Sequence, residues 1–438
     1  MCRQKPFNLM NGEAFPSTSV ACNVTDLFWN EGVTTPSAKQ RLECYGLGRR
    51  KEIIMDTDVF EQFIEQLQRY VRERLIPAEK EILETETIPE AIVSEMRDMG
   101  LFGLTMPEEY GGAGMNIQQY IRTIRELSYA MPCYRSITSI NIGMVSSAFK
   151  NGATDAQKAE WLPRLAAGEI ASFGLTEPGS GSDSAAMQTI AVKSGNGWVL
   201  NGTKRYITNA PFANVALIMA RTSKEALPKN AHVSAFIVPM DTLGISVGKS
   251  DKKMGQSGSH IADIIMDDVK LPADAILGGE EGKGFAFAMK SLDNGRLSIG
   301  AAATGYARRA LDSALRYTNE RKAFGEPIAN FQLIQQMLAD SDIEIYAAEA
   351  MLEDAARRAD AGENVLRKAA AVKVFASEMC GRVVDRVVQI YGGAGYLAEY
   401  DAERFYRDAR IYRIYEGTTQ ILQLQIAKHM LREWAAQG

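Results

Sequence analysis

The spacing of apolar residues divides the chain into segments of different character. From Asp58 to Leu75 apolar side chains recur every three or four positions, and the same spacing is found over 90–99, 117–130 and 155–166. This spacing places the apolar residues on one face of a helix. The first part of the chain is therefore predicted to be helical, with a turn-forming cluster at 107–114.

The period changes near Ala171. Two short runs of alternating character, 190–193 and 198–200, are separated by Ser-Gly-Asn-Gly, which predicts a β-hairpin. Further strands are predicted from β-branched runs, which cover 215–219, 233–238, 245–247 and 264–266.

Helical spacing returns from about Phe285 to Trp434. The clear helix candidates are 308–317, 331–358, 366–391 and 419–434. The layout is therefore mostly α with a central β domain.

We expect four parts with distinct roles. Residues 1–54 are rich in Gly, Pro, Ser, Thr and Asn and keep no period, so they are predicted to be a disordered extension. The other parts are a helical domain over 55–170, a β domain over 171–282 and a helical bundle over 283–438.

Composition excludes several classes of protein. The 438 residues are 46% hydrophobic and 24% charged, with a net charge of −5 and no long basic run, so no nucleic-acid partner is expected. The three histidines lack ligand spacing, and no metal site is proposed. No apolar run is long enough to span a bilayer.

The number and spacing of the cysteines indicate whether the protein works in a reducing or an oxidising compartment. Five cysteines are scattered along the chain without a C-x-x-C pair, which argues against a disulfide framework and favours a reducing compartment. We expect a cytoplasmic protein if the source is bacterial, and a mitochondrial matrix protein if it is eukaryotic.

The most informative segment is Phe173-Gly-Leu-Thr-Glu-Pro-Gly-Ser-Gly-Ser-Asp183. Its glycines let the backbone approach a ligand closely, and its N–H and hydroxyl groups are able to hold a polar ring or a phosphate. A glycine-rich loop on its own is more often an ordinary connection between strands.

Four other segments favour a functional interpretation of this loop. They are Tyr-Ile-Thr-Asn at 206–209, Arg-Lys-Ala-Phe-Gly at 321–325, Gln-Ile-Tyr-Gly-Gly-Ala-Gly-Tyr at 389–396 and Tyr-Glu-Gly-Thr-Thr-Gln at 415–420. Each has an ordinary interpretation when taken alone. For example, Arg321 would be a surface charge and Glu416 a carboxylate at the start of a helix.

Together and in order, these segments resemble the acyl-CoA dehydrogenase family over about 58–431. The resemblance implies an N-terminal helical domain, a middle β-barrel-like domain and a C-terminal four-helix bundle. It also implies FAD as cofactor and α,β-dehydrogenation of an acyl-CoA thioester, as in fatty acid β-oxidation. The partners that it implies are an electron-transfer flavoprotein and further copies of the chain in a homotetramer.

The resemblance also assigns roles to individual residues. Those that would contact FAD are Phe173, Leu175, Thr176, Ser182, Tyr206, Thr208, Arg321, Phe324, Gln332, Gln389, Gly393, Thr418 and Gln420. Arg321, Phe324, Gln332, Gln389 and Gly393 would serve the FAD of a neighbouring subunit. The residues that would contact substrate are Ser182, Asp293, Arg296 and Gly417.

Glu416 is the predicted catalytic base. Removal of the α-proton needs a carboxylate whose pKa is raised by burial, and we expect Tyr412, Ile414 and Tyr415 to give it an apolar neighbourhood. Some family branches place the base just before the arginine that here is Arg296. That position is Gly295 in this chain, which favours Glu416.

Two alternatives stay open at this point. An acyl-CoA oxidase would share the fold, although oxidases of this family are usually much longer. A non-catalytic protein that binds acyl-CoA or flavin would share the fold without using Glu416 as a base.

Overall fold

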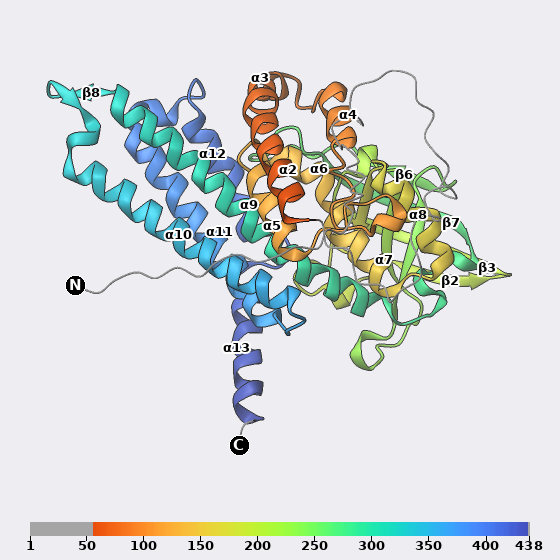
Figure 1. The fold of residues 1–438 in the computed structure, drawn as a ribbon. Coiled ribbons are helices and arrows are strands. Elements are labelled where there is room, and N and C mark those ends of the chain that lie inside the picture. The colour runs from red at the N-terminus through yellow and green to blue at the C-terminus, as the bar shows by residue number, and fades with distance from the viewer. Residues whose placement is uncertain (1–55, 437–438) are drawn as a thin grey trace, which may run out of the picture. The chain divides into compact units, whose positions relative to one another are not determined.

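A computed structural model of the chain describes residues 56–436. The predicted extension, residues 1–54, lies outside the described residues. At positions 293 and 294 the backbone is described and the side chains are not. Helices, then a compact β unit, then helices follow one another along the chain, as the sequence predicts (Figure 1).

The first part is a group of helices around an apolar core. The helix α2 (Thr57–Tyr70) continues through one π-helical stretch, η3 (Val71–Leu75), into α3 (Ile76–Thr85). The remaining predicted helices are α4 (Glu90–Asp98), α5 (Ile117–Leu127) and α8 (Asp155–Ala166). Capping boxes at Asn116 and Thr154 satisfy the first backbone N–H groups of α5 and α8 and define where they begin.

One helical region has no counterpart among the predictions. It runs through α6 (Pro132–Ser139), η5 (Ile140–Val145) and α7 (Ser146–Gly152). Nearly every residue from 132 to 149 is buried, so the segment has no polar face and no amphipathic period.

A seven-stranded sheet forms the middle of the chain. Its strands are β1 (Ala171–Gly174), β2 (Ile190–Ser194), β3 (Gly197–Thr208), β4 (Val215–Arg221), β5 (Val233–Pro239), β6 (Ile245–Val247) and β7 (Ile261–Pro272). Neighbouring strands follow the order β1-β4-β2-β3-β7-β6, and β5 pairs with β4. The predicted hairpin is confirmed, since Ser194 pairs with Gly197. The pairing of β3 with β7 shifts between Lys204 and Ile207, which bends β3 next to Tyr206.

The last part is a bundle of long helices (Figure 1). It consists of α9 (Gly284–Glu320), α10 (Gln332–Asp360), α11 (Leu366–Tyr391), α12 (Asp401–Ala409) and α13 (Thr419–Ala435). A small hairpin, β8 (Lys322–Ala323) with β9 (Glu326–Pro327), joins α9 to α10. Within residues 56–436, no helix is long and apolar enough to cross a membrane.

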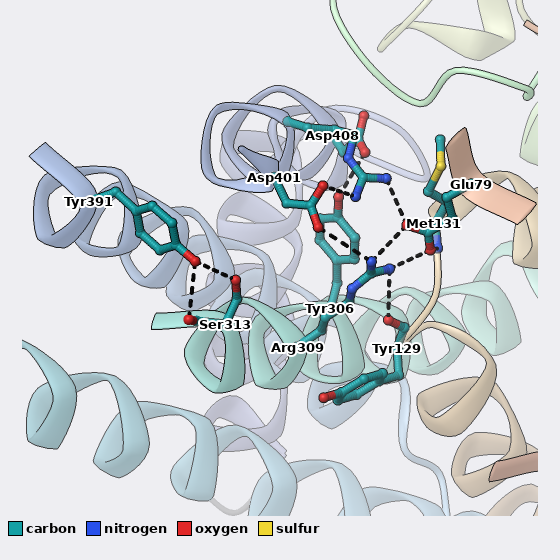
Figure 2. Close-up of polar contacts among 10 residues, drawn as sticks. Glu79, Tyr129, Met131, Tyr306, Arg309, Ser313, Tyr391, Asp401 and Asp408 are labelled. Atoms are coloured by element: carbon teal, nitrogen blue, oxygen red, sulfur yellow. Dashed lines mark hydrogen bonds and ion pairs between the residues drawn. The ribbon is translucent and has the colours of Figure 1, made fainter. Parts of the chain in front are cut away.

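A buried polar network ties the first helices to the bundle (Figure 2). The carboxylate of Glu79 on α3 accepts hydrogen bonds from Arg309 on α9, from Arg404 on α12 and from the backbone N–H of Met131. Because each charge has a partner inside the protein, the network holds these four separate segments in one arrangement.

The same network reaches the loop between β6 and β7. Asp408, on α12, accepts hydrogen bonds from the hydroxyl of Tyr306 at 2.7 Å and from the backbone N–H of Gln256. Burial raises the pKa of Asp408. Since α12 leads directly into η13 (Arg410–Arg413) and the turn at Glu416, these bonds also position that turn.

Candidate active site

Glu416 lies in the turn between η13 and α13. Its backbone is left-handed, with φ 53°, and the following Gly417 has φ 97°. Thr418 ends the turn by capping α13, because its hydroxyl accepts a hydrogen bond from the N–H of Ile421. The side chain of Glu416 is only 10% exposed.

The carboxylate of Glu416 rests on the backbone of α9. A Cβ atom added to Gly295 would lie 2.0 Å from Oε2 of Glu416 and 2.8 Å from its Cδ. The two positions that the resemblance offers for the base, 416 and 295, are therefore in direct contact in this protein. The absence of a side chain at 295 is what leaves room for the Glu416 carboxylate.

Three cationic groups surround this carboxylate. Nη2 of Arg135 on α6 lies 3.9 Å from Oε1, and Nζ of Lys373 on α11 donates to the backbone carbonyl of Gly417 at 2.7 Å. Burial raises the pKa of Glu416, while Arg135, Lys373 and Arg296 act in the opposite direction. Burial also lowers the pKa of Lys373 to about 8.

Of the residues expected to enclose Glu416, Tyr412 is buried while Ile414 is 45% exposed. Charged groups from α6, α9 and α11, which we did not expect, also act on Glu416. The sequence contains one signal for Arg135, which is the only charged residue between Glu126 and Lys150. A lone charge in so apolar a run indicates a buried group with a specific partner.

The loop that follows β1 is held by a buried ion pair. Nζ of Lys204 donates to Oε1 of Glu177 at 2.7 Å, and both side chains are almost fully buried. The carboxylate of Glu177 also accepts hydrogen bonds from the N–H groups of Gln188 and Thr189. These contacts fix the backbone next to Thr176.

The outer side of this loop is open. Cβ atoms added at Gly179 and Gly181 would meet nothing within 4 Å, and Ser182 is exposed. Phe173 and Leu175 turn their side chains into the core, so their backbones are the parts of these residues nearest the surface.

Tyr206 stands at the bend of β3. Its φ is 59° and its side chain is 56% exposed. Thr208 is partly buried two residues further on, and its carbonyl accepts a hydrogen bond from Ser172. The irregular pairing at this bend accounts for the positive φ, and it leaves the ring of Tyr206 exposed where a ligand could contact it.

A second group of predicted FAD residues lies far from the first. Helix α9 has 37 residues and begins against β5, where Gly284 touches Ser234, and ends at the β8–β9 hairpin (Figure 1). At 1.5 Å per residue it spans about 55 Å. Arg321, Phe324 and Gln332 are at its far end, so they cannot reach the loop at 176–183 of the same chain.

The ends of α9 and α11 lie together at this far end. The rings of Tyr317 and Tyr391 stack at a centroid distance of 3.9 Å, and η12 (Gly392–Tyr396) follows at once. Gln389 and Gly393 are exposed there. The structure thus separates the predicted FAD residues into two groups.

Both groups carry exposed side chains or backbone that suit parts of FAD. Phe324 is 97% exposed with φ 54°, and the guanidinium of Arg321 has no hydrogen-bond or ion-pair partner within residues 56–436. An uncovered aromatic ring and an unpaired cation suit adenine and pyrophosphate, while the glycine loop and Tyr206 suit the flavin ring.

The remaining predicted residues are close to Glu416. Arg296 and Gly417 lie in its immediate surroundings, and Gln420 is exposed in the first turn of α13. The side chain of Asp293 lies outside the described residues.

Comparison with protein-family models gives three consecutive matches. They are the acyl-CoA dehydrogenase N-terminal domain over 57–169, the middle domain over 172–269 and the C-terminal domain over 282–431.

Individual proteins agree with these matches. The human mitochondrial short-chain specific acyl-CoA dehydrogenase is 39% identical and is aligned over 83% of this chain and 88% of its own length. The caffeyl-CoA reductase–Etf complex subunit CarC of Acetobacterium woodii is 38% identical over 81% of this chain and 93% of its own length. The structure of butyryl-CoA dehydrogenase from Megasphaera elsdenii superposes with a TM-score of 0.82 at 35% identity, covering 86% of this chain and 99% of that one.

Proposed function

Because the chain belongs to the acyl-CoA dehydrogenase family, whose members are FAD enzymes, we propose that Glu416 is the base that removes the α-proton of an acyl-CoA thioester. The observation that carries this proposal is the buried carboxylate beside Gly295. Its Oε2 has no hydrogen-bond partner within residues 56–436, so it is free to accept a proton.

The surroundings of Glu416 serve both of its protonation states. Arg135, Lys373 and Arg296 keep the carboxylate ionised before reaction, because opposite charges nearby stabilise the charged form. Burial stabilises the neutral acid that results when the α-proton has been accepted. Bound FAD would supply the acceptor for the β-hydrogen, leaving as hydride, and the expected product is the trans-2-enoyl thioester.

We propose that the two groups of FAD residues meet between subunits. In this arrangement Thr176, Ser182, Tyr206, Thr208 and Gln420 hold the flavin half in one chain. The adenine and pyrophosphate half is held by the neighbouring chain, through its residues corresponding to Arg321, Phe324, Gln332, Gln389 and Gly393. The length of α9 supports this assignment, and a homotetramer, or at least a dimer, is the expected assembly.

We also propose residues that bind the substrate, and a class of protein that accepts the electrons. Arg296, Gly417 and Asp293 are proposed to bind the thioester, and Ser182 to approach the CoA arm. An electron-transfer flavoprotein is the proposed acceptor, supported by a 38% identical relative that is a subunit of an Etf complex.

The test is Glu416→Gln, measured with acyl-CoA thioesters and an artificial electron acceptor. The amide keeps the size of the side chain but cannot take the proton, so turnover should fall by about 10²–10⁴-fold with FAD still bound. The matched control is Glu344→Gln, which changes a carboxylate on α10 that pairs with Arg382 and Arg386. Near-normal turnover of Glu416→Gln would show that another group is the base.

A rescue experiment uses the contact between the two positions. Because a side chain at 295 collides with the one at 416, the rescue must combine Gly295→Glu with Glu416→Gly. Partial recovery of turnover relative to Glu416→Gly alone is expected, since the carboxylate would then enter the same space from α9.

A further inference from the structure

The position of the Glu416 carboxylate depends on the backbone of its turn. Oε2 has no hydrogen-bond partner within residues 56–436, and Oε1 lies 3.9 Å from Nη2 of Arg135, which is beyond hydrogen-bond distance. The side chain is therefore directed mainly by the turn that carries it.

The backbone of this turn is strained. Glu416 is a non-glycine residue at φ 53°, and it is followed by Gly417 at φ 97°. Residues with a Cβ atom rarely adopt a positive φ, so such a residue keeps its conformation only where the surrounding structure fixes it. The contacts that hold the two ends of the turn therefore also control the placement of the base.

Both ends of the turn are held by one side chain of α11. Oε1 of Glu378 accepts a hydrogen bond from the hydroxyl of Thr419 at 2.8 Å, and Oε2 of Glu378 lies 2.7 Å from Nη2 of Arg413. Arg413 is the last residue of η13 and Thr419 is the first residue of α13. The two partners of Glu378 therefore flank the turn that carries the base.

These contacts affect geometry more than stability. The side chains of Glu378 and Arg413 are 24% and 38% exposed, and ion pairs with this exposure contribute little to the free energy of unfolding. Lys373, also on α11, adds a third point, because its Nζ donates to the carbonyl of Gly417 within the turn. Two side chains of one helix thus hold the turn at its start, middle and end.

Building on the function proposed above, we propose that Glu378 is a positioning residue for the base. By bridging Arg413 and Thr419 it fixes the turn, and so directs the Glu416 carboxylate toward the α-carbon of the thioester. Most residues proposed to hold FAD and the thioester lie on other elements. Loss of Glu378 should therefore slow proton removal more than it weakens binding.

A purely structural role for Glu378 would be to pack α11 against α13. In that case the loss of another contact between these two helices would have a similar effect. Glu433 on α13 offers this control, since it pairs with Arg367 on α11 at 3.2 Å. Glu433→Ala removes a contact between the same two helices without touching a residue of the turn.

The experiment measures anaerobic bleaching of the flavin by butyryl-CoA in a stopped-flow instrument, with rates expressed per bound flavin. For Glu378→Ala we expect the bleaching rate constant to fall about 10- to 100-fold, with the dissociation constant for butyryl-CoA changed by less than about threefold. Glu378→Gln should recover part of the rate, because its amide oxygen still accepts a hydrogen bond. Hydrogen–deuterium exchange over 411–421 should rise in Glu378→Ala and not in Glu433→Ala.

Each outcome bears on a definite claim. An unchanged bleaching rate in Glu378→Ala, or an equal fall in Glu433→Ala, would overturn the role of Glu378. If Glu378→Ala does not fold, Thr419→Val decides, because it removes a hydroxyl that binds Glu378 and is not the one that caps α13. An unaffected rate in Thr419→Val would then overturn the role.

Failure of the proposed function would look different. A folded, flavin-containing wild type that no acyl-CoA thioester bleaches would contradict the proposed function itself, and the role of Glu378 with it. A wild type that is bleached, together with variants that behave like it, would contradict the role of Glu378 alone.

Discussion

Replacing Gly295 by alanine should damage catalysis while leaving the fold intact. The new Cβ would lie 2.0 Å from Oε2 of Glu416, whereas real Cβ contacts are essentially never shorter than 3.0 Å. The carboxylate must therefore move by about 1 Å, and a misplacement of this size costs about 10²-fold in rate. This loss corresponds to about 2.7 kcal/mol of transition-state stabilisation.

Stability should change in the opposite direction. The atom displaced is the end of a flexible side chain, and alanine is favoured over glycine within a helix by about 0.5–1 kcal/mol. We therefore expect Gly295→Ala to have an unchanged or slightly raised melting temperature together with a kcat about 100-fold lower.

The matched control is Gly381→Ala on α11. Its added Cβ would be 3.8 Å from the nearest atoms of Arg413, an ordinary contact, so it should gain the same helix propensity without loss of activity. The assays are steady-state reduction of an electron acceptor and thermal unfolding of the flavin-loaded protein. A kcat for Gly295→Ala within about threefold of the wild type would refute the placement of the reacting carboxylate at Gly295.

Three further predictions follow from buried charges and from the separated FAD residues. Lys204→Met should leave Glu177 buried and unpaired, lowering the free energy of unfolding by about 3–5 kcal/mol and weakening FAD retention, as urea titration and flavin fluorescence would show. Since Glu416 must be ionised to act, kcat/KM should fall as the pH drops through its raised pKa, and Lys373→Met, by removing a nearby cation, should move that fall to higher pH. An unshifted profile would contradict this coupling. Arg321→Gln should weaken FAD binding without altering the pH profile, measured by equilibrium dialysis.

Much of the fold could be predicted from apolar spacing and helix ends. The predicted ranges 155–166 and 366–391 coincide with α8 and α11, because a capping box begins the first and Gly392 follows the second. The region of α6, η5 and α7 escaped prediction because nearly every residue from 132 to 149 is buried, so that it shows no period.

The site was predictable only in part. The turn at Glu416 could be found from its motif, but the cations beside it could not, since Arg135 and Lys373 come from distant segments and meet Glu416 only through the packing of α6 and α11. The contact with Gly295 likewise depends on how α13 and α9 approach each other, which no local pattern encodes.

The length of α9 has a consequence for genetics as well as for chemistry. If each FAD lies between two chains, a defect at Phe324 or Arg321 disables the neighbour's site rather than the chain's own. Mixing such a variant with one that lacks Glu416 would then generate some sites in which the intact turn of one chain faces the intact hairpin of another. Two inactive alleles would therefore complement each other in mixed oligomers, although each variant on its own would form only inactive sites.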